Sequence, residues 1–178
     1  MRFDHPDRIF RIRNNKEFSR TALEVFHYQA ANNLVYNLFL KSLGKDHNLV
    51  SHVSEIPFMP ASFFRSHKVI TEVTGFDAVF ESSTTTGNTP SRHYVYDLKI
   101  YETSFLKTFK LFYGNPADYM ISALLPSYHE RGNSSLVFMM DRIIKESRHP
   151  LSGFYKNNPE QLITNIRNAT SGNYKAIL

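Results

Sequence analysis

Residues 82–91 combine side chains and backbone freedom suited to binding an anion. This hydroxyl-rich segment lies within FESSTTTGNTPSRH, residues 80–93, and follows an apolar run. Successive hydroxyls and backbone N–H groups can converge on one phosphate. A solvated surface turn is the alternative interpretation, because the same residue types are common in exposed turns. The consecutive hydroxyl and glycine residues are Ser82, Ser83, Thr84, Thr85, Thr86 and Gly87.

A second polar segment, residues 127–135, places an acid, a base and a guanidinium side by side. Glu130 and Arg131 precede Ser134 and Ser135, which open a predicted helix. The N–H groups of a helix N-terminus can receive an anion, and an arginine can bind a phosphate or carboxylate. The alternative is a helix cap with an exposed ion pair.

Several well-known sites are absent from the sequence. The hydroxyl-rich segment lacks the Gly-Lys-Ser/Thr of a Walker A loop and the GxGxxG of a dinucleotide site. No GxSxG elbow occurs, so a hydrolase triad has no support. The 8 histidines are scattered and the chain has no cysteine, so we predict no metal site, disulfide or thiol nucleophile.

The composition is that of an ordinary globular domain. The chain has 178 residues, of which 42% are hydrophobic and 21% charged. Its net charge of +5 comes from scattered basic residues, so we do not expect a nucleic-acid partner. We expect no membrane span, because no apolar run is long enough, and no secretory signal, because the N-terminus is charged. The expected location is cytoplasmic.

The pattern of apolar residues predicts an α/β fold with a helical N-terminal cap. We expect a mixed, largely parallel sheet, with residues 1–54 forming the helical region and residues 55–178 a partial α/β domain. Both polar segments are predicted to follow strands, the position where ligands bind in open α/β sheets. Helices are expected over residues 16–43 with a break at Asn32–Asn33, and over 61–66, 98–113, 134–147 and 159–169; strands over 68–73, 78–81, 93–96, 119–125, 175–178 and, as a loop or short strand, 150–155.

Several motifs in order resemble one known family. IPFMPASFFRSHKV, FESSTTTGNTPSRHYVYD, YETSF, FYG, ALLPSYHERGNSSLVFMMD and SGFY are similar to segments of the LuxE-type acyl-protein synthetases, the long-chain fatty-acid–protein ligases. That family resembles the adenylate-forming ligases, which include phenylacetate–CoA ligase. The matching segments run from about Glu55 to Tyr155. The resemblance implies that this chain carries part of an adenylate-forming ligase fold.

The resemblance also implies which residues bind nucleotide. The phosphate loop of the family, approximately SSGTTG-x-x-S, falls on residues 82–87 and Ser91. Thr84 replaces the usual glycine, and a β-branched residue is costly if that position needs a positive φ. The superfamily has a lysine after the loop proline, whereas Pro90 is followed here by Ser91 and Arg92.

The implied reaction is activation of a carboxylic acid, most simply a fatty acid. ATP with Mg²⁺ would give an acyl-adenylate and pyrophosphate, and the acyl group would pass to a protein or thiol acceptor. Catalysis would rest on positioning and on charge stabilisation. His93, Glu130 and Arg131 are the polar residues expected near the reacting groups, in unassigned roles.

Members of the family are longer than this chain. They continue into further strands and a C-terminal domain that bears a lysine and, in the luminescence enzymes, an acyl-accepting cysteine. We therefore expect that this chain is the N-terminal phosphate-loop part and is inactive in a full adenylation cycle by itself. Two alternatives stay open: a non-catalytic binding module derived from the family, and an acyltransferase that works without ATP.

Overall fold

The computed structural model describes residues 6–71, 75–83, 89–127, 130–171 and 175–178. The chain divides into two compact units, residues 1–100 and residues 101–178. The sequence predicted a boundary after residue 54, but hydrogen bonds cross that position. The Tyr36 hydroxyl donates to the carbonyl of Pro57 (2.6 Å), and the Thr71 hydroxyl donates to the side-chain oxygen of Gln29 (2.5 Å). The N-terminal helices thus belong to a larger unit.

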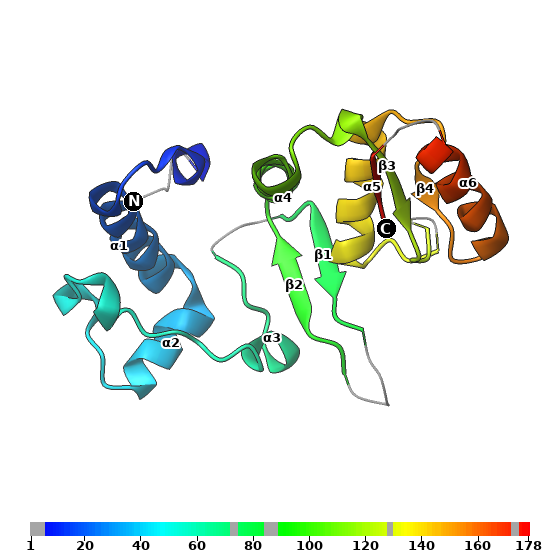
Figure 1. Ribbon diagram of the computed structural model, residues 1–178. Coiled ribbons are helices and arrows are strands. Elements are labelled where there is room, and N and C mark those ends of the chain that lie inside the picture. Colours follow the sequence, from blue (N-terminus) through cyan, green and yellow to red (C-terminus); the bar gives the residue numbers. More distant parts are fainter. Residues whose placement is uncertain (1–5, 72–74, 84–88, 128–129, 172–174) are drawn as a thin grey trace. The chain divides into compact units, whose positions relative to one another are not determined.

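Two helices separated at Asn33 begin the first unit (Figure 1). They are α1 (Asn15–Asn32) and α2 (Leu34–Ser42). The Asn33 side chain accepts the N–H of Tyr36 at 3.1 Å, which caps a new helix where the preceding one ends. The predicted break is therefore confirmed. Buried apolar side chains from both helices and the following segment form a core of Phe26, Ala30, Leu40 and Val50.

Short elements surround these helices. Phe63 and Phe39 contact each other edge to face, with ring centroids 5.5 Å apart, which attaches α3 to α2. The short elements are η1 (Pro6–Arg11), η2 (His47–Leu49), η3 (Val53–Glu55) and α3 (Phe63–Ser66), the first three being 3-10 helices.

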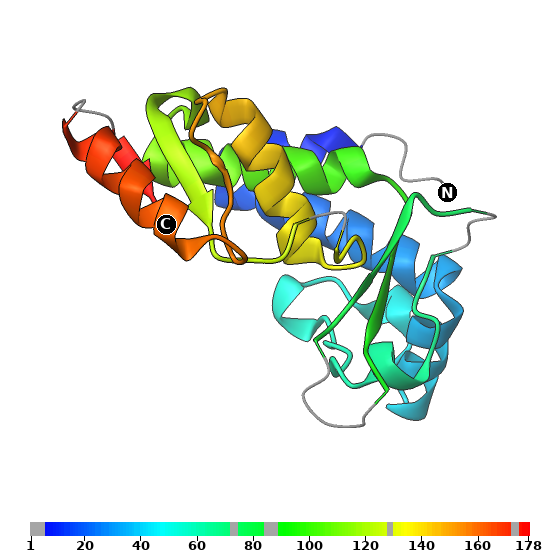
Figure 2. The same cartoon turned by 90° about the vertical axis from the view of Figure 1, so that its right-hand side faces the viewer.

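An antiparallel pair of strands completes the first unit. The strands β1 (Ala78–Glu81) and β2 (Arg92–Val95) run side by side in both views (Figure 1, Figure 2). Their register places Glu81 opposite Arg92 and Ala78 opposite Val95. The two ends of the hydroxyl-rich segment are therefore brought together. The predicted strand over residues 78–81 is confirmed.

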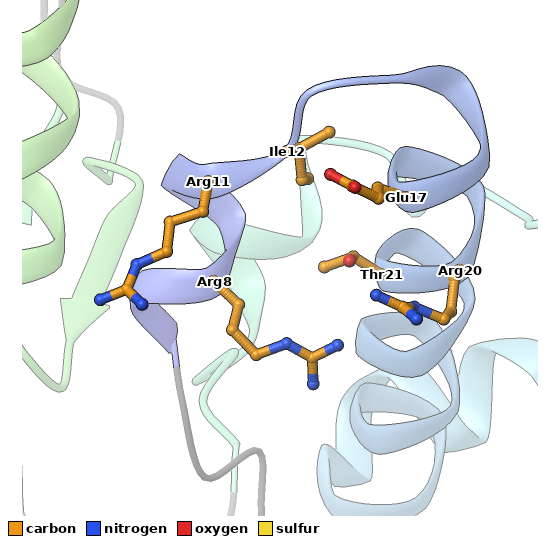
Figure 3. Close-up of a pocket in the computed structure, with 6 residues that line it drawn as sticks. All are labelled: Arg8, Arg11, Ile12, Glu17, Arg20 and Thr21. Carbon is orange, nitrogen blue, oxygen red and sulfur yellow. The ribbon is translucent and has the colours of Figure 1, made fainter.

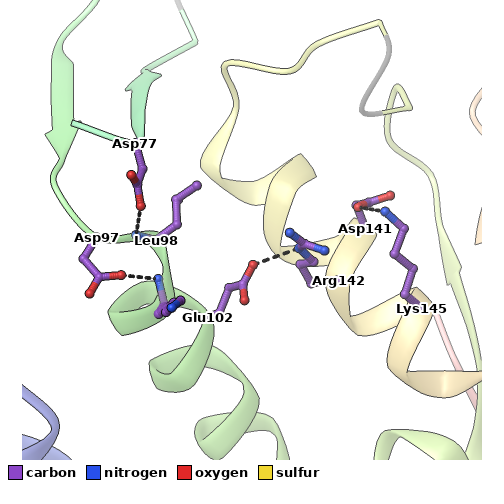
Figure 4. A network of polar contacts seen from close by, with 8 residues as sticks. Asp77, Asp97, Leu98, Glu102, Asp141, Arg142 and Lys145 are labelled. Atoms are coloured by element: carbon purple, nitrogen blue, oxygen red, sulfur yellow. Dashed lines mark hydrogen bonds and ion pairs between the residues drawn. The ribbon is translucent and has the colours of Figure 1, made fainter. Parts of the chain in front are cut away.

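A long amphipathic helix leads into the second unit. In Figure 4, the Asp77 carboxylate accepts the N–H of Leu98 (3.0 Å), and Asp97 accepts that of Lys99 (2.8 Å). These bonds satisfy donors in the first turn of α4 (Leu98–Tyr113). Gly114 ends the helix with φ +88°, a left-handed conformation that glycine adopts without strain. The sequence predicted both limits of α4 correctly.

A three-stranded parallel sheet organises the second unit, with strand order β4-β3-β5. The crossover from β3 to β4 and the one from β4 to β5 run in opposite directions across the sheet. Because such crossovers are right-handed, α5 and α6 cover opposite faces, as Figure 1 shows. The remaining elements of this unit are η4 (Pro116–Asp118, a 3-10 helix), β3 (Tyr119–Ala123), α5 (Ser135–Ser147), β4 (Gly153–Phe154), α6 (Pro159–Ser171) and β5 (Lys175–Ile177).

Two helix boundaries in this unit follow from local residues. Asn158 accepts the N–H of Gln161 at 3.2 Å, so the Asn-Pro-Glu start of α6 forms as predicted. The α5 helix ends where Arg148 adopts a left-handed conformation, φ 54°. Buried Met120 and Ile121 on β3 form the centre of the sheet.

The α/β class is confirmed, but two expectations about strands were wrong. Residues 68–71 form no strand, although Val69, Ile70 and Thr71 are β-branched. Val69 is buried and Thr71 bonds Gln29, so these side chains serve tertiary contacts. The hydroxyl-rich segment was expected beside a largely parallel sheet, yet the strand before it pairs antiparallel with the strand after it. The parallel sheet lies entirely in the second unit.

Candidate functional site

Two hydrogen bonds between the same residues close the base of the hydroxyl-rich segment. The N–H of Ser82 donates to the carbonyl of Ser91 (3.0 Å), and the N–H of Ser91 donates to the hydroxyl oxygen of Ser82 (3.0 Å). Ser83, which follows, is exposed. The predicted phosphate-binding residues Thr84, Thr85, Thr86 and Gly87 lie outside the described residues.

An ion pair lies directly below this base. The Arg92 Nε atom is 3.0 Å from a carboxylate oxygen of Glu81. The hydrogen bond and the charge of Glu81 raise the pKa of Arg92 above its ordinary value. Arg92 is 54% exposed, so the pair is screened by solvent and contributes little to stability. It does hold a cation next to the hydroxyl-rich segment.

His93 is the second residue of β2 and lies opposite Phe80 in the strand register. Its ring contacts Phe64 of α3 with the centroids 5.4 Å apart. Burial of the covered side lowers the pKa of His93 below its ordinary value. At neutral pH the imidazole is therefore neutral, with one ring nitrogen able to accept a hydrogen bond and the other able to donate one.

The Glu130 carboxylate in the second polar segment accepts three hydrogen bonds. One oxygen accepts the N–H of Ser127 (2.7 Å) and its hydroxyl (2.8 Å), and the other accepts the side-chain amide of Asn157 (3.0 Å). The Ser127 backbone bond, followed by the Ser127 hydroxyl and Asn157, lowers the pKa of Glu130. The carboxylate is therefore ionised at neutral pH and ties two segments of the unit together.

Arg131 is exposed beside this carboxylate. Its backbone N–H donates to the carbonyl of Ser127 (3.1 Å), and its own carbonyl accepts the N–H of Ser134 (3.2 Å). The Ser134 hydroxyl then accepts the N–H of Val137 at 3.4 Å and caps α5. The ion pairs between described residues do not include Arg131, so its guanidinium faces solvent.

The second polar segment follows the carboxyl end of a parallel strand, the edge at which ligands bind in open α/β folds. It follows β3, whose helix α5 covers one face, whereas the residues after β4 lead to α6 on the other face. The N–H of Tyr155 donates to the carbonyl of Ala123 (2.8 Å), which keeps the two strand ends adjacent. The Glu130–Asn157 bond joins the segments that follow the carboxyl ends of these two parallel strands.

The structure thus groups the predicted site residues in two sets. His93 lies on β2 and Ser82 and Ser91 adjoin the ends of β1 and β2, whereas Glu130 and Arg131 share one turn in the second unit. A single site that combines both sets stays a prediction.

Sequence reasoning did not single out Asn157 or the Glu81–Arg92 pair. The signal for this ion pair was present in the sequence, because the acidic Glu81 and the basic Arg92 flank the hydroxyl-rich segment. No local pattern connects Asn157 with Glu130, since 27 residues separate them.

Among the described residues, no group of three or more His, Asp or Glu side chains is placed to hold a metal ion. No helix in the described part of the chain has the length and apolarity to cross a bilayer. No family model, curated protein or solved structure matches this chain.

Proposed function

We propose that the hydroxyl-rich segment binds the phosphates of ATP in the activation of a carboxylic acid. The segment resembles the phosphate loop of LuxE-type ligases, and the ordered motifs on either side of it support this assignment. One structural observation carries the proposal. The reciprocal Ser82–Ser91 bonds hold the two described ends of the segment together. A closed base of this kind supports a loop whose hydroxyls and N–H groups converge on one anion.

The proposed reaction needs charge stabilisation more than a protein nucleophile. An oxygen of a fatty carboxylate attacks the α-phosphorus of ATP, the bond to the bridging oxygen breaks, and pyrophosphate leaves with its electron pair. Donors in the hydroxyl-rich segment hold the β- and γ-phosphates while negative charge develops there. Mg²⁺ would neutralise part of this charge, and it is commonly held by substrate phosphates and water rather than by a protein cage. A nucleophile of a protein or thiol acceptor then attacks the acyl carbon, the bond from that carbon to the phosphate oxygen breaks, and AMP leaves with the electron pair.

The described neighbours of the segment suit different tasks. Ser82 uses its hydroxyl oxygen to accept the Ser91 N–H, so its proton is available to a phosphate oxygen. Neutral His93 suits orientation of a polar group by hydrogen bonding. Glu130 is held ionised by three donors and suits a positioning role, whereas exposed Arg131 suits contact with an anion.

Calorimetric titration of the full chain with ATP and Mg²⁺ tests the phosphate-binding step. We expect saturable binding by the wild type and at least about tenfold weaker binding by the double variant Thr85→Ala, Thr86→Ala. Each hydrogen bond to a charged group contributes about 1.5–3 kcal/mol, which sets the scale of this loss. Thr108→Ala with Thr164→Ala is the matched control, because both hydroxyls bond helix carbonyls on exposed surfaces.

Absence of ATP binding, or equal binding by both double variants, contradicts the proposal. Carboxylate-dependent exchange between ATP and pyrophosphate, measured with this chain joined to the C-terminal part that the family resemblance implies, then separates catalysis from binding. ATP binding without exchange indicates a non-catalytic binding module. Acyl transfer from acyl-CoA in the absence of nucleotide indicates the ATP-independent acyltransferase.

A further inference from the structure

A small arginine-lined pocket lies between η1 and α1, within the first unit (Figure 3). Its volume is about 100 Å³. One water molecule takes up roughly 30 Å³ of the liquid, so the pocket exceeds the size of a single water but cannot enclose a nucleoside. The residues that line it are Arg8, Arg11, Ile12, Glu17, Arg20 and Thr21.

Positive charge exceeds negative charge around this pocket. Glu24 is the ion-pair partner of both Arg8 (3.1 Å) and Arg20 (3.8 Å), so one carboxylate is shared between two guanidinium groups. Glu17 accepts the backbone N–H of Arg13 at 2.9 Å. With Arg11 included, three guanidinium groups stand against two carboxylates. One net positive charge is left, and it favours an anion.

The two ion pairs leave donors for a ligand. Arg20 contacts Glu24 through its Nε atom, and Arg8 contacts Glu24 through one terminal nitrogen. Each guanidinium carries five N–H donors, so most of its donors are not used by these ion pairs. In Figure 3 the Arg8 side chain extends from η1 toward Arg20 and Thr21 on α1, whereas the Arg11 guanidinium points away from them. Arg8 and Arg20 are therefore the pair that can grip one anion from two sides.

Thr21 adds a neutral hydrogen-bonding group to the lining of this pocket. Its side chain lines the pocket, although the residue is only 4% exposed. The Thr21 hydroxyl is not one of the buried polar atoms of the described structure that lack a partner, so it is open to the pocket. A hydroxyl that faces a positively charged pocket can donate a hydrogen bond to a bound oxyanion.

We propose that this pocket binds a small tetrahedral oxyanion, namely inorganic phosphate or the terminal phosphate of a phosphate monoester. Arg8 and Arg20 supply the charge-assisted hydrogen bonds, and the Thr21 hydroxyl supplies a neutral one. This site is separate from the hydroxyl-rich segment and does not depend on it. Its size favours a single phosphate group over a whole nucleotide.

Titration of the full chain with inorganic phosphate, at constant ionic strength against chloride and followed by ³¹P NMR, tests the site. We expect saturable binding that Arg20→Ala weakens by about tenfold or more and Thr21→Val by a few-fold, because the first loses a charge-assisted bond. Thr21→Val keeps the shape of the side chain and is the safer variant for folding. Glycerol phosphate in a second titration distinguishes a monoester from the free ion.

Arg13→Ala is the control for loss of one positive charge, since Arg13 does not line the pocket. It should leave phosphate affinity within about twofold of the wild type. Absence of phosphate binding, equal weakening by Arg13→Ala and Arg20→Ala, or tighter binding of acetate than of phosphate would overturn the proposal. The double variant at Thr85 and Thr86 should bind phosphate here as the wild type does, so this site and the proposed ATP site fail independently.

Discussion

The two polar segments of this protein are anchored in different ways. The hydroxyl-rich segment is closed at its base by Ser82 and Ser91, which bond each other through backbone and side chain on neighbouring antiparallel strands. The second polar segment is instead gathered by one carboxylate, Glu130, which also reaches Asn157 beyond β4. The first arrangement uses backbone groups and one hydroxyl oxygen, and it involves no charged group. In the second arrangement, the Glu130 carboxylate accepts hydrogen bonds from the protein itself and so has a structural role.

Serines around β3 sharpen this contrast. The Ser147 hydroxyl donates to the carbonyl of Tyr119 (3.0 Å) and lies 2.6 Å from the Ser152 hydroxyl. The Ser152 oxygen accepts the N–H of Ile121 at 2.9 Å. These hydroxyls take the place of a backbone partner along the part of β3 that β4 does not reach. A hydroxyl is therefore evidence for a ligand site only where it keeps a donor or an acceptor position that the protein does not already use.

The largest effect on stability is expected from Ser147→Ala, which removes a hydroxyl that bonds only to other groups of the protein. Ser147 is 2% exposed, and its loss deprives Tyr119, His149 and Ser152 of a partner. We expect a fall in the free energy of unfolding of about 1–3 kcal/mol, because buried groups are left unsatisfied. Urea denaturation followed by circular dichroism measures it.

Ser122→Ala is the matched control for that experiment. Ser122 is 1% exposed on β3, and its hydroxyl is a buried polar atom that has no hydrogen-bond partner in the described structure. Removing an unsatisfied hydroxyl should raise the free energy of unfolding by about 1 kcal/mol. The same substitution then has opposite signs at two buried serines. If Ser122→Ala lowered the free energy of unfolding as much as Ser147→Ala, the hydrogen-bond partners of a buried hydroxyl would not determine the effect of removing it.

The elements that sequence predicted correctly are those whose causes are local. The start of α6 needs only Asn158, Pro159 and Glu160, and the end of α4 needs only Gly114. Each of these boundaries depends on residues within one or two turns of chain, so periodicity and capping rules suffice.

The elements that sequence missed depend on distant partners. The run Val69, Ile70, Thr71 has the composition of a strand, but Thr71 bonds Gln29 at a separation of 42 residues. The antiparallel pairing of β1 with β2 likewise depends on the strand that lies beside each of them in the folded protein. A single sequence does not specify that neighbour. In the candidate site, the residue types of Glu130 and Arg131 were visible, whereas the bond from Asn157 that gives Glu130 its structural task was not.

The pH dependence of stability tests the structural use of Glu130. Its pKa is lowered in the folded protein by the Ser127 and Asn157 donors. A carboxyl with a depressed folded-state pKa contributes its full stabilisation above the pKa of the unfolded state, about 4.3 for glutamate, and loses it as pH falls through the folded value. Glu130→Gln should therefore lower Tm near pH 6 and reduce the decline of Tm between about pH 5 and pH 3.

Glu55 also has a lowered pKa, through the backbone N–H groups of Ser51 and His52, so part of the acid decline should survive in Glu130→Gln. Glu146→Gln is the control, because Glu146 is exposed on α5 and forms no hydrogen bond with described residues. Its Tm should follow the wild-type curve. Identical curves for Glu130→Gln and the wild type would contradict the structural assignment of this carboxylate.

The smallest effect is expected at the base of the hydroxyl-rich segment. Ser82→Ala removes the acceptor of the Ser91 N–H but keeps the backbone bond between the same residues. Because the site is exposed, water replaces the lost partner, and the free energy of unfolding should change by less than about 1 kcal/mol. Hydrogen exchange at the Ser91 amide should nevertheless become faster, and the affinity for ATP with Mg²⁺ should fall by less than in the Thr85, Thr86 double variant. Ser83→Ala is the neighbouring control and should leave the Ser91 amide unchanged. Equal exchange at Ser91 in Ser82→Ala and the wild type would show that the base is not closed in solution, and the contrast between the two polar segments would then disappear.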